Sequence, residues 1–368
     1  MSTQNWFRPE VSQLPQYVAG KRDTDPNVIK LSSNELPFGP TAEVARAINA
    51  AAELVNRYPD MANADLRERL AQFEDWPANG IVLGNGSTAL IEKFLQAVAV
   101  PGAEVVYPWR SFEAYPIAVL AAGATPVPVP LHADGSHDLE AMLAAITDNT
   151  RAIMVCSPNN PTGVPISHAQ LEAFLERVPK HIPVLIDEAY IHFASGVGEA
   201  IQDSKALARK FPNVLVARTF SKAFGLAGLR VGYVLASAEI AAGLTAISTP
   251  FGVNLIAQRA ALAALDSSAE VFERVETIVA ERERMSRGVR ELGFAVPQSA
   301  ANFIWFAGEG QVSVDDAEAP AIDAARLEEL GREEGIITRR FGDEGVRVSV
   351  AEPAGTERLL AALEKLGN

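Results

Sequence analysis

The sequence has few of the features that mark a secreted or membrane-inserted protein. It contains a single cysteine, Cys156, which excludes an intrachain disulfide framework. No apolar run approaches the roughly 18–20 residues that a membrane-spanning helix requires. The opening residues, MSTQNWFRPE, lack the basic and apolar segments of a signal peptide. These absences predict a cytoplasmic protein.

Positive charge is also scarce, because 32 Lys and Arg residues stand against 46 Asp and Glu residues and give a formal net charge of −14. Such a charge repels phosphate backbones and anionic lipid surfaces, so we expect neither nucleic acid nor a membrane as a partner. The rest of the composition is that of a globular protein, with 48% hydrophobic and 21% charged residues. A length of 368 residues suffices for one large and one smaller domain.

From about residue 45, short apolar runs alternate with amphipathic stretches. The runs are rich in valine and isoleucine, as strands buried on both faces should be. The expected strands are Ile81–Leu83, Glu104–Tyr107, Ala152–Cys156, Val184–Ile186, Val214–Ala217 and Val231–Leu235. Helical patterns such as Asp65–Phe73 and His168–Arg177 lie between them. The alternation predicts an α/β fold with a large, mainly parallel sheet covered by helices on both faces.

The pattern changes near Asp266. Apolar residues from Val271 to Leu292 recur at spacings of three, four and seven, which predicts a long helix with one apolar face. We expect its charged run, Glu281–Arg284, to be the solvated side. Two strand-like segments, 302–306 and 345–350, follow this helix.

These later elements predict a second, smaller α+β domain that ends in a helix starting near Gly355. We therefore expect a large domain at residues 46–274 and a smaller one at residues 275–368. The polar N-terminal arm, residues 1–45, cannot form a core alone and is expected to drape over the smaller domain. The stretch Gly308–Pro320 is expected to be a surface insertion.

One lysine stands out in the segment TFSKAFGLAGLR, residues 219–230. Lys222 comes directly after an expected strand and is flanked by small and hydroxyl residues, where lysine is seldom found. One interpretation is a lysine whose deprotonated amine forms a Schiff base with a cofactor aldehyde. Ser221 and Arg230 would then hold a cofactor phosphate. The other interpretation is a solvated lysine in a glycine-rich loop.

Two further motifs carry polar residues at strand ends. In VLIDEAY, Asp187 ends a buried strand, which is costly for a carboxylate without a partner. A protonated pyridinium nitrogen would be such a partner, and Tyr190 could donate its hydroxyl to the O3′ of the same ring. Alternatively, Asp187 only caps the next helix. In CSPNNPTG, a turn by composition, Asn160 could also donate to O3′.

The segment GNGST, residues 84–88, follows a strand and opens a helix. The backbone N–H groups of Gly86, Ser87 and Thr88 would form a phosphate cradle at a helix N-terminus. Many α/β proteins have such a turn, so this motif by itself indicates little.

In combination, GNGST, NNPTG, DEAY and SKAFGLAGLRVGY resemble the fold-type I aminotransferases, and more narrowly the histidinol-phosphate aminotransferase family. The resemblance runs from about Arg8 to the C-terminus. It implies pyridoxal 5′-phosphate as the cofactor, no metal, and a homodimer with composite active sites. The strings WRSFEAYP and RPEVSQLPQYVAGK resemble the aromatic amino acid aminotransferase branch found in actinobacteria.

The resemblance also implies roles for individual residues. Lys222, Asp187 and Tyr190 would be catalytic, and the cofactor would further contact Gly86, Ser87, Thr88, Asn160, Ser221 and Arg230. Tyr58 in NRYPD would reach the cofactor phosphate of the neighbouring subunit.

Four residues would bind the substrate by the same resemblance. Arg347 would clamp the α-carboxylate, a task for which the bidentate guanidinium suits arginine better than lysine. Tyr17 and Asn34 would close over the substrate, and Arg339 would contact its distal group.

Two residues are candidates for stacking on the cofactor ring, because the segment YPWRSFEAY departs from the family's pattern by one position. Phe112, paired with Tyr115, is the favoured candidate, and Trp109 is the second.

We expect ping-pong transamination between an aromatic L-amino acid (phenylalanine or tyrosine) and a 2-oxo acid such as 2-oxoglutarate. Leu36 and Phe251 would supply apolar walls. A histidinol-phosphate aminotransferase is the alternative, because Arg339 and Arg340 could bind a phosphate. A lyase or decarboxylase on the same fold also stays open. A cofactor-binding transcription regulator would need a helix-turn-helix extension and a basic face, and the sequence has neither.

Overall fold

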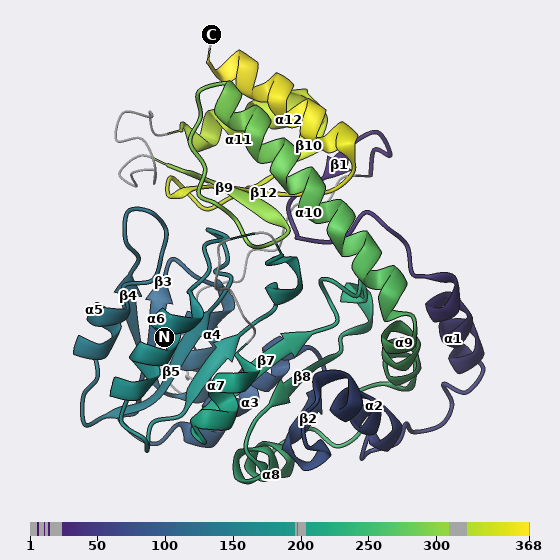
Figure 1. Cartoon of the computed structure of the whole chain (residues 1–368), viewed down its shortest axis with the longest axis vertical. Helices are drawn as coiled ribbons and strands as arrows, with labels where there is room; N and C mark the ends of the chain where they lie inside the picture. Colours follow the sequence, from purple (N-terminus) through teal and green to yellow (C-terminus); the bar gives the residue numbers. More distant parts are fainter. Residues whose placement is uncertain are drawn as a thin grey trace.

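The computed structural model describes residues 24–195, 204–308 and 322–367, together with Trp6, Val11, Leu14 and Val197. Tyr17 and all but Gly308 of the expected insertion at Gly308–Pro320 lie outside these described residues. The chain forms a large part built on a seven-stranded sheet and a smaller part that carries the C-terminus (Figure 1).

The large sheet has the strand order β2-β8-β7-β6-β5-β3-β4. Its strands are β2 (Ile81–Gly84), β3 (Glu104–Trp109), β4 (Thr125–Pro130), β5 (Thr150–Cys156), β6 (Val184–Asp187), β7 (Val214–Thr219) and β8 (Gly232–Leu235). The strand β8 pairs antiparallel with β2 and β7, and all other pairings in this sheet are parallel. All six expected strands are present, and the mainly parallel α/β architecture is confirmed.

The sequence patterns did not indicate β4, whose residues TPVPVP include three prolines. Proline has no N–H to donate to a sheet and is therefore confined to edge strands. The strand lies at the edge of the sheet, where it pairs only with β3.

Helices cover both faces of the large sheet (Figure 1). On one face lie α2 (Ala64–Glu74), α5 (Leu139–Ala144), α6 (His168–Arg177) and α7 (Lys205–Lys210). On the other lie α3 (Ser87–Val98), α4 (Ala114–Ala122) and α8 (Ala238–Ala246). Successive residues of a strand contribute to opposite faces, so Val184 and Ile186 pack in one hydrophobic cluster and Leu185 in the other. Three single 3₁₀ turns complete this part: η2 (Ala78–Gly80), η3 (Ile191–Phe193) and η4 (Ala227–Leu229).

The smaller part contains a three-stranded antiparallel sheet in the order β11-β12-β9. Its elements are β9 (Phe303–Ala307), β10 (Ile336–Ile337), β11 (Arg339–Arg340), β12 (Gly345–Ser349), α11 (Ala324–Glu333) and α12 (Pro353–Leu366). The strand β1 (Ile29–Lys30) pairs in parallel with β10, so residues 29–30 belong to the smaller part although most of the chain separates them from it in sequence. Two strands and a terminal helix were expected here.

On the right of Figure 1, the long helix α10 (Ser268–Glu291) runs from the smaller part down to α9 (Leu255–Asp266), beside which α1 (Ala42–Ala52) packs. The long helix α10 was expected, and it runs without interruption across residue 275. The division at residues 46–274 and 275–368 therefore stays a prediction, with its proposed boundary inside a helix.

The expectation that Glu281–Arg284 forms a solvated side of α10 is wrong for two of its residues. Arg282 is 1% exposed and donates from Nη1 to the carbonyl oxygens of Phe193, at 2.7 Å, and Ala301, at 3.0 Å. Glu281 is also buried and accepts from Arg284 and from the hydroxyl of Thr356. Because α10 packs against other elements on more than its apolar face, these two polar residues are covered, whereas Glu283 stays exposed and Arg284 partly exposed.

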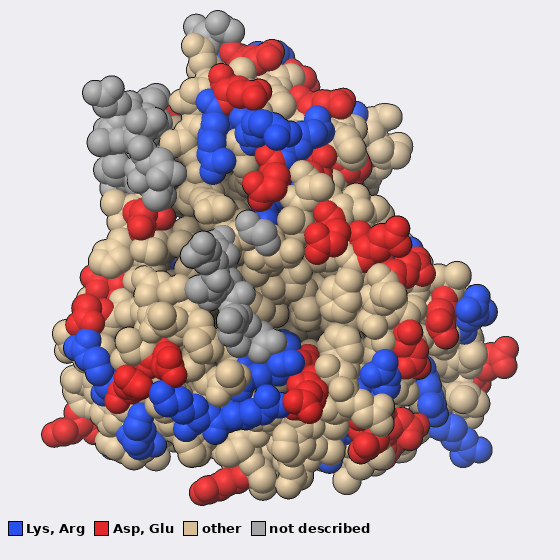
Figure 2. Space-filling model, viewed as in Figure 1, with Lys and Arg blue, Asp and Glu red and all other residues tan. Residues whose placement is uncertain are grey.

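Acidic and basic side chains are interspersed over the face shown in Figure 2, with other residues between them. Among the described residues, no helix combines the length and the apolar character that crossing a membrane needs.

Candidate active site

A cavity of about 210 Å³ opens where the parallel strands β5, β6 and β7 end. We call it the inner cavity, and its lining residues are Ser87, Thr88, Phe112, Cys156, Asn160, Asp187, Ala189, Tyr190, Thr219, Ser221, Lys222 and Arg230. The carboxyl ends of adjacent parallel strands meet at one sheet edge, which is where α/β sheets bind ligands. The fold thus brings together most of the predicted cofactor residues.

Lys222 follows β7 by three residues, and its amine lies inside the cavity. Its Nζ donates to the backbone carbonyl oxygens of Ser33, at 3.2 Å, and Asn34, at 3.4 Å. Burial, followed by the positive charge of Arg347, lowers the pKa of Lys222 to about 7. A large fraction of the amine is therefore neutral near physiological pH, which is the form that attacks an aldehyde.

Asp187 also lines the inner cavity and is 3% exposed. Its Oδ2 accepts a hydrogen bond from the Tyr115 hydroxyl at 3.0 Å, and its Oδ1 accepts one from the Ala189 N–H at 3.2 Å. Burial raises the pKa of Asp187 to about 6 although these hydrogen bonds oppose it. A cation at this position would relieve that cost. The next helical turn, η3, begins only after Tyr190, so Asp187 is not its cap.

A cradle for an anion forms where α3 begins. Gly86 precedes the helix with φ 85°, and a Cβ atom there would lie 2.4 Å from Nη2 of Arg230. Only glycine therefore permits both this backbone conformation and the approach of the guanidinium group. Arg230 donates from Nη1 to Oγ of Ser221 at 3.1 Å. With the N-terminal N–H groups and hydroxyls of Ser87 and Thr88, these groups suit a phosphate.

A smaller cavity of about 100 Å³, the outer cavity, adjoins the first. Its lining residues are Ser32, Ser33, Asn34, Phe112, Glu113, Asn160, Tyr190, Lys222, Arg339, Phe341 and Arg347. The two cavities share Lys222, Phe112, Asn160 and Tyr190, so a molecule bound in one lies next to the other.

Arg347 is buried at the outer cavity and donates to two neutral oxygen atoms. Its Nη1 contacts Oδ1 of Asn160, and its Nη2 contacts the carbonyl oxygen of Ser32 at 2.8 Å. Asn34, with φ 54°, donates from Nδ2 to the hydroxyl of Tyr190 at 2.9 Å. Burial raises the pKa of Tyr190, so its hydroxyl stays protonated and can donate.

Phe112 lines both cavities, and its stacking on the cofactor ring stays a prediction. The other candidate, Trp109, lines neither, and the Arg110 guanidinium covers its ring at 4.2 Å from the centroid. The guess that Leu36 and Phe251 form apolar walls also finds no support in this chain. The aromatic residues that line the outer cavity with Phe112 are Tyr190 and Phe341.

Tyr58 is 82% exposed and lies outside both cavities, with its ring centroid 4.7 Å from that of Phe251. Because Tyr58 is exposed on its own subunit, its contact with the cofactor of a neighbouring subunit stays a prediction. Tyr17 lies outside the described residues.

Sequence reasoning missed several residues at the site, among them Tyr115, Glu113 and Phe341. Tyr115 was named only as a neighbour of Phe112, and its contact with Asp187 was not expected. Glu113 meets Arg339, with its Oε2 2.7 Å from Nη2, and Phe341 packs beside both. The only available signal was the spacing of Phe112, Glu113 and Tyr115 within one turn at the start of α4.

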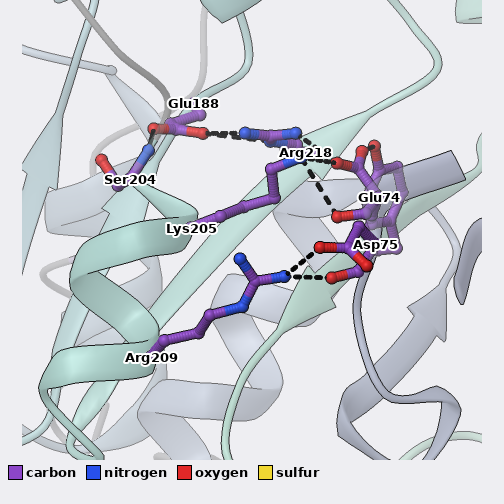
Figure 3. Close-up of polar contacts among 8 residues, drawn as sticks. Glu74, Asp75, Glu188, Ser204, Lys205, Arg209 and Arg218 are labelled. Atoms are coloured by element: carbon purple, nitrogen blue, oxygen red, sulfur yellow. Dashed lines mark hydrogen bonds and ion pairs between the residues drawn. The ribbon is translucent and has the colours of Figure 1, made fainter.

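A buried charge network begins at the residue that follows Asp187 in the chain (Figure 3). The next residue, Glu188, accepts from Arg218 at 2.7 Å, and Arg218 also donates to Glu74 at 2.7 Å. Lys205 lies 3.2 Å from the same Glu74 oxygen, and the N–H of Ser204 donates to Glu188 at 2.7 Å. These contacts tie β6, β7, α2 and α7 together and fix the turn that carries Asp187.

The two cavities fit pyridoxal 5′-phosphate. The lysine with a lowered pKa would suit the cofactor aldehyde, the buried carboxyl with a raised pKa would suit a pyridinium nitrogen, and the Gly86 cradle would suit a phosphate. Three such chemically matched groups around one mixed sheet define a fold-type I pyridoxal-phosphate enzyme. The sequence model described as aminotransferase class I and II matches residues 26–363. The chain belongs to this family and is a pyridoxal-phosphate-dependent aminotransferase.

Curated relatives match along almost the whole chain. An aromatic amino acid aminotransferase of Corynebacterium glutamicum (strain R) is 45% identical, over 98% of this chain and 99% of that protein. One of Mycobacteroides abscessus is 45% identical, over 96% of this chain and 97% of that protein. Among solved structures, histidinol-phosphate aminotransferase of Sinorhizobium meliloti in complex with pyridoxal-5′-phosphate is 28% identical with a TM-score of 0.85, covering 100% of this chain and 98% of that one.

Proposed function

We propose that this aminotransferase transfers the amino group between an aromatic L-amino acid, phenylalanine or tyrosine, and a 2-oxo acid such as 2-oxoglutarate. The observation that carries the proposal is the outer cavity, where Arg347 and Lys222 lie near each other and two aromatic rings, Phe112 and Phe341, stand beside them. An arginine suits an α-carboxylate, a lysine the adjacent amine, and aromatic walls an aromatic side chain. The two curated relatives described above carry the same activity in their names.

Bound pyridoxal phosphate would supply the electron sink that makes the α-proton of the amino acid removable. Gly86, Ser87, Thr88, Ser221 and Arg230 would hold its phosphate. Asp187 would keep its ring nitrogen protonated, and Asn160 and Tyr190 would donate to its O3′.

The chain's own groups would then perform the proton transfers. The amine of Lys222, once released by the incoming substrate, would accept the α-proton, because burial keeps much of it neutral. Arg347 would grip the α-carboxylate and fix which bond faces that amine. The backbone carbonyl oxygen of Asn34 lies 3.4 Å from Nζ of Lys222, and Asn34 would close over the bound substrate.

The alternative substrate, histidinol phosphate, has weaker support. It required Arg339 and Arg340 to bind a phosphate. Arg339 lines the outer cavity but is already paired with Glu113. Arg340 does not line either cavity, and its Nε lies 3.8 Å from Glu328.

We further infer a homodimer in which Tyr58 of one subunit reaches the cofactor phosphate of the other. The exposure of Tyr58 and of its neighbours Leu54, Val55, Met61 and Phe251 supports the inference, because a water-facing apolar cluster of this kind is typical of an interface. A cytoplasmic location also stays a prediction from the sequence.

The test is a half-reaction assay on the purified, cofactor-loaded enzyme, with phenylalanine, tyrosine and histidinol phosphate offered separately. We expect kcat/KM for the two aromatic amino acids to exceed that for histidinol phosphate by at least about tenfold, a difference of about 1.4 kcal/mol. The opposite ranking would make the protein a histidine-biosynthesis enzyme and leave its cofactor chemistry unchanged.

A further inference from the structure

Asn34 connects the smaller part of the molecule to the cavities. It adopts the left-handed backbone conformation, with φ 54°, which asparagine tolerates better than most residues. The residue is 1% exposed, and its Nδ2 donates to the hydroxyl of Tyr190 at 2.9 Å. Its backbone carbonyl oxygen accepts from Nδ2 of Asn302 at 3.2 Å, so Asn34 is also held by the residue that precedes β9.

The side-chain amide of Asn34 has a defined orientation, which Ser349 on β12 sets. The hydroxyl of Ser349 accepts from the N–H of Asn34 at 2.8 Å and donates to Oδ1 of Asn34 at 2.8 Å. Ser349 is 1% exposed, and among the described residues Oδ1 of Asn34 is the acceptor that its hydroxyl hydrogen has. A flipped amide would leave this buried hydrogen without an acceptor, which is unfavourable. Oδ1 therefore faces Ser349, and Nδ2 faces Tyr190.

This orientation decides what the hydroxyl of Tyr190 can do. A tyrosine hydroxyl carries one hydrogen and can also accept. Because Nδ2 of Asn34 supplies a hydrogen to it, the hydrogen of Tyr190 itself remains available for an acceptor in the inner cavity, which Tyr190 lines. With the amide flipped, Oδ1 of Asn34 would take that hydrogen instead.

We propose that Ser349 is a positioning residue, which orients the Asn34 amide so that Tyr190 donates its hydrogen to the O3′ of pyridoxal phosphate. The proposal rests on the donation from Tyr190 to O3′ that the proposed function includes. Ser349 lines neither cavity and therefore acts through Asn34 and Tyr190. A donor to O3′ stabilises negative charge on that oxygen, and so lowers the pH at which the bound cofactor loses its proton.

The experiment follows the visible absorbance of the cofactor-loaded enzyme against pH, without substrate. Tyr190→Phe removes the donor, so we expect the midpoint of the titration to rise by about 1 pH unit. Ser349→Ala allows the Asn34 amide to flip, and its midpoint should rise by about 0.5–1 pH unit. Ser349→Cys keeps a side chain of similar size that donates only weakly, and should shift the midpoint in the same direction by less.

A double variant and a matched control separate this role from a general effect on packing. In Ser349→Ala/Tyr190→Phe the midpoint should rise no further than in Tyr190→Phe, because both changes remove the same hydrogen bond. Ser299→Ala is the control. The Ser299 hydroxyl is buried before β9, donates to the carbonyl oxygen of Phe303 at 2.6 Å and accepts from the N–H of Ala301 at 3.1 Å. Its removal should leave the midpoint within about 0.2 pH unit of wild type.

Three outcomes overturn the proposal: an unchanged midpoint in Ser349→Ala, an additive shift in the double variant, or an equal shift in Ser299→Ala. If the midpoint of Tyr190→Phe does not move, Tyr190 does not donate to O3′ and the role of Ser349 is wrong as well. The titration contains no substrate, so it is independent of the half-reaction assay. If phenylalanine fails as a substrate while the expected shifts appear, the proposed substrate is wrong and the role of Ser349 stands.

Discussion

The hydroxyl of Tyr115 lies 3.0 Å from Oδ2 of Asp187 and donates its hydrogen to that carboxylate. Both side chains are buried, and they come from different elements, α4 and the end of β6. A hydrogen bond to an ionised group in such surroundings favours the ionised form. Tyr115 therefore acts against burial and keeps Asp187 available as the partner of a cationic ring nitrogen.

The first prediction concerns this hydrogen bond. Tyr115→Phe should lower kcat and raise the dissociation constant of pyridoxal phosphate, each by about tenfold, because a hydrogen bond to a charged group contributes about 1.5–3 kcal/mol. Cofactor affinity is measured by fluorescence titration of cofactor-free protein. Tyr107→Phe is the control, since the Tyr107 ring is buried and packs edge-to-face on that of Tyr115, whereas the hydrogen bond to Asp187 comes from Tyr115. Equal effects of the two substitutions would contradict the assignment.

The second prediction concerns the pH dependence of stability without cofactor. Burial raises the pKa of Asp187 from 3.8 to about 6 in the folded chain. Between these values the folded state binds more protons than the unfolded state, so stability falls as pH rises from about 4 to about 6. Asp187→Asn removes this dependence. The difference in free energy of unfolding, Asp187→Asn minus wild type, should therefore be larger at pH 7.5 than at pH 4 by on the order of 2–3 kcal/mol.

Urea unfolding of both cofactor-free proteins at the two pH values measures this difference. With cofactor bound the sign should reverse at pH 7.5, because the neutral amide of the Asp187→Asn variant cannot form an ion pair with a ring cation. A stability difference that does not depend on pH would show that Asp187 is ionised equally in both states.

The third prediction concerns Lys222. Borohydride treatment of the loaded enzyme should fix the cofactor on the peptide that contains Lys222, detected by mass spectrometry. Lys222→Ala should still bind the cofactor through the phosphate cradle and Asp187, yet lose amino transfer by at least about 1,000-fold, because it lacks both nucleophile and base. Lys365→Ala, at an exposed position on α12, should leave labelling and rate unchanged. A label on any other lysine would refute the assignment.

The fourth prediction compares two arginines shown in Figure 3. Arg218 is 3% exposed between Glu74 and Glu188, whereas Arg209 pairs with Asp75 at the surface. Arg218→Met leaves two buried carboxylates with one partner fewer and should lower the free energy of unfolding by about 3–5 kcal/mol. Arg209→Met should cost no more than about 1 kcal/mol. Chemical denaturation of the loaded proteins measures both, and similar losses would contradict the difference in burial.

The fifth prediction concerns subunit exchange. If Tyr58 completes the site of a partner subunit, mixing inactive Lys222→Ala with a weakened Tyr58→Phe should restore activity. The mixed dimer has one site that carries both defects and one that carries neither. Each variant mixed with itself is the control. No recovery after verified exchange, or a fully active monomer on dilution, would count against the composite site.

Sequence patterns predicted those parts of the fold whose signal is local. Strands such as Val184–Ile186 were found because both faces are buried and the run is uniformly apolar. The motif residues Asp187 and Lys222 were found because a charge at the end of such a strand is unusual. The burial of Arg282 could not be read in this way, because its partners, the carbonyls of Phe193 and Ala301, are distant in sequence.

The same limit applies to the site. Glu113 and Arg339 are separated by more than two hundred residues, and each is an ordinary surface residue by composition. Their pairing depends on how the smaller part sits against the turn before α4. The hydrogen bond between Tyr115 and Asp187 could not be predicted for the same reason. Residue spacing within α4 shows which residues share a helical turn, but it does not show which residues of other elements they contact.

The pairing of β1 with β10 has a consequence for protein engineering. The segment that follows β1, residues 31–34, also forms hydrogen bonds with the smaller part. The N–H of Ser349 donates to the carbonyl oxygen of Leu31 at 2.8 Å, and the N–H of Asn34 donates to Oγ of Ser349 at 2.8 Å. In the folded enzyme, residues 29–34 therefore belong with the C-terminal portion, although almost the whole gene lies between them. A chimera that replaces the smaller part with that of a relative therefore needs two exchanged segments, the C-terminal one and residues 29–34. Replacing the C-terminal segment alone would leave the original β1 to pair with a foreign β10.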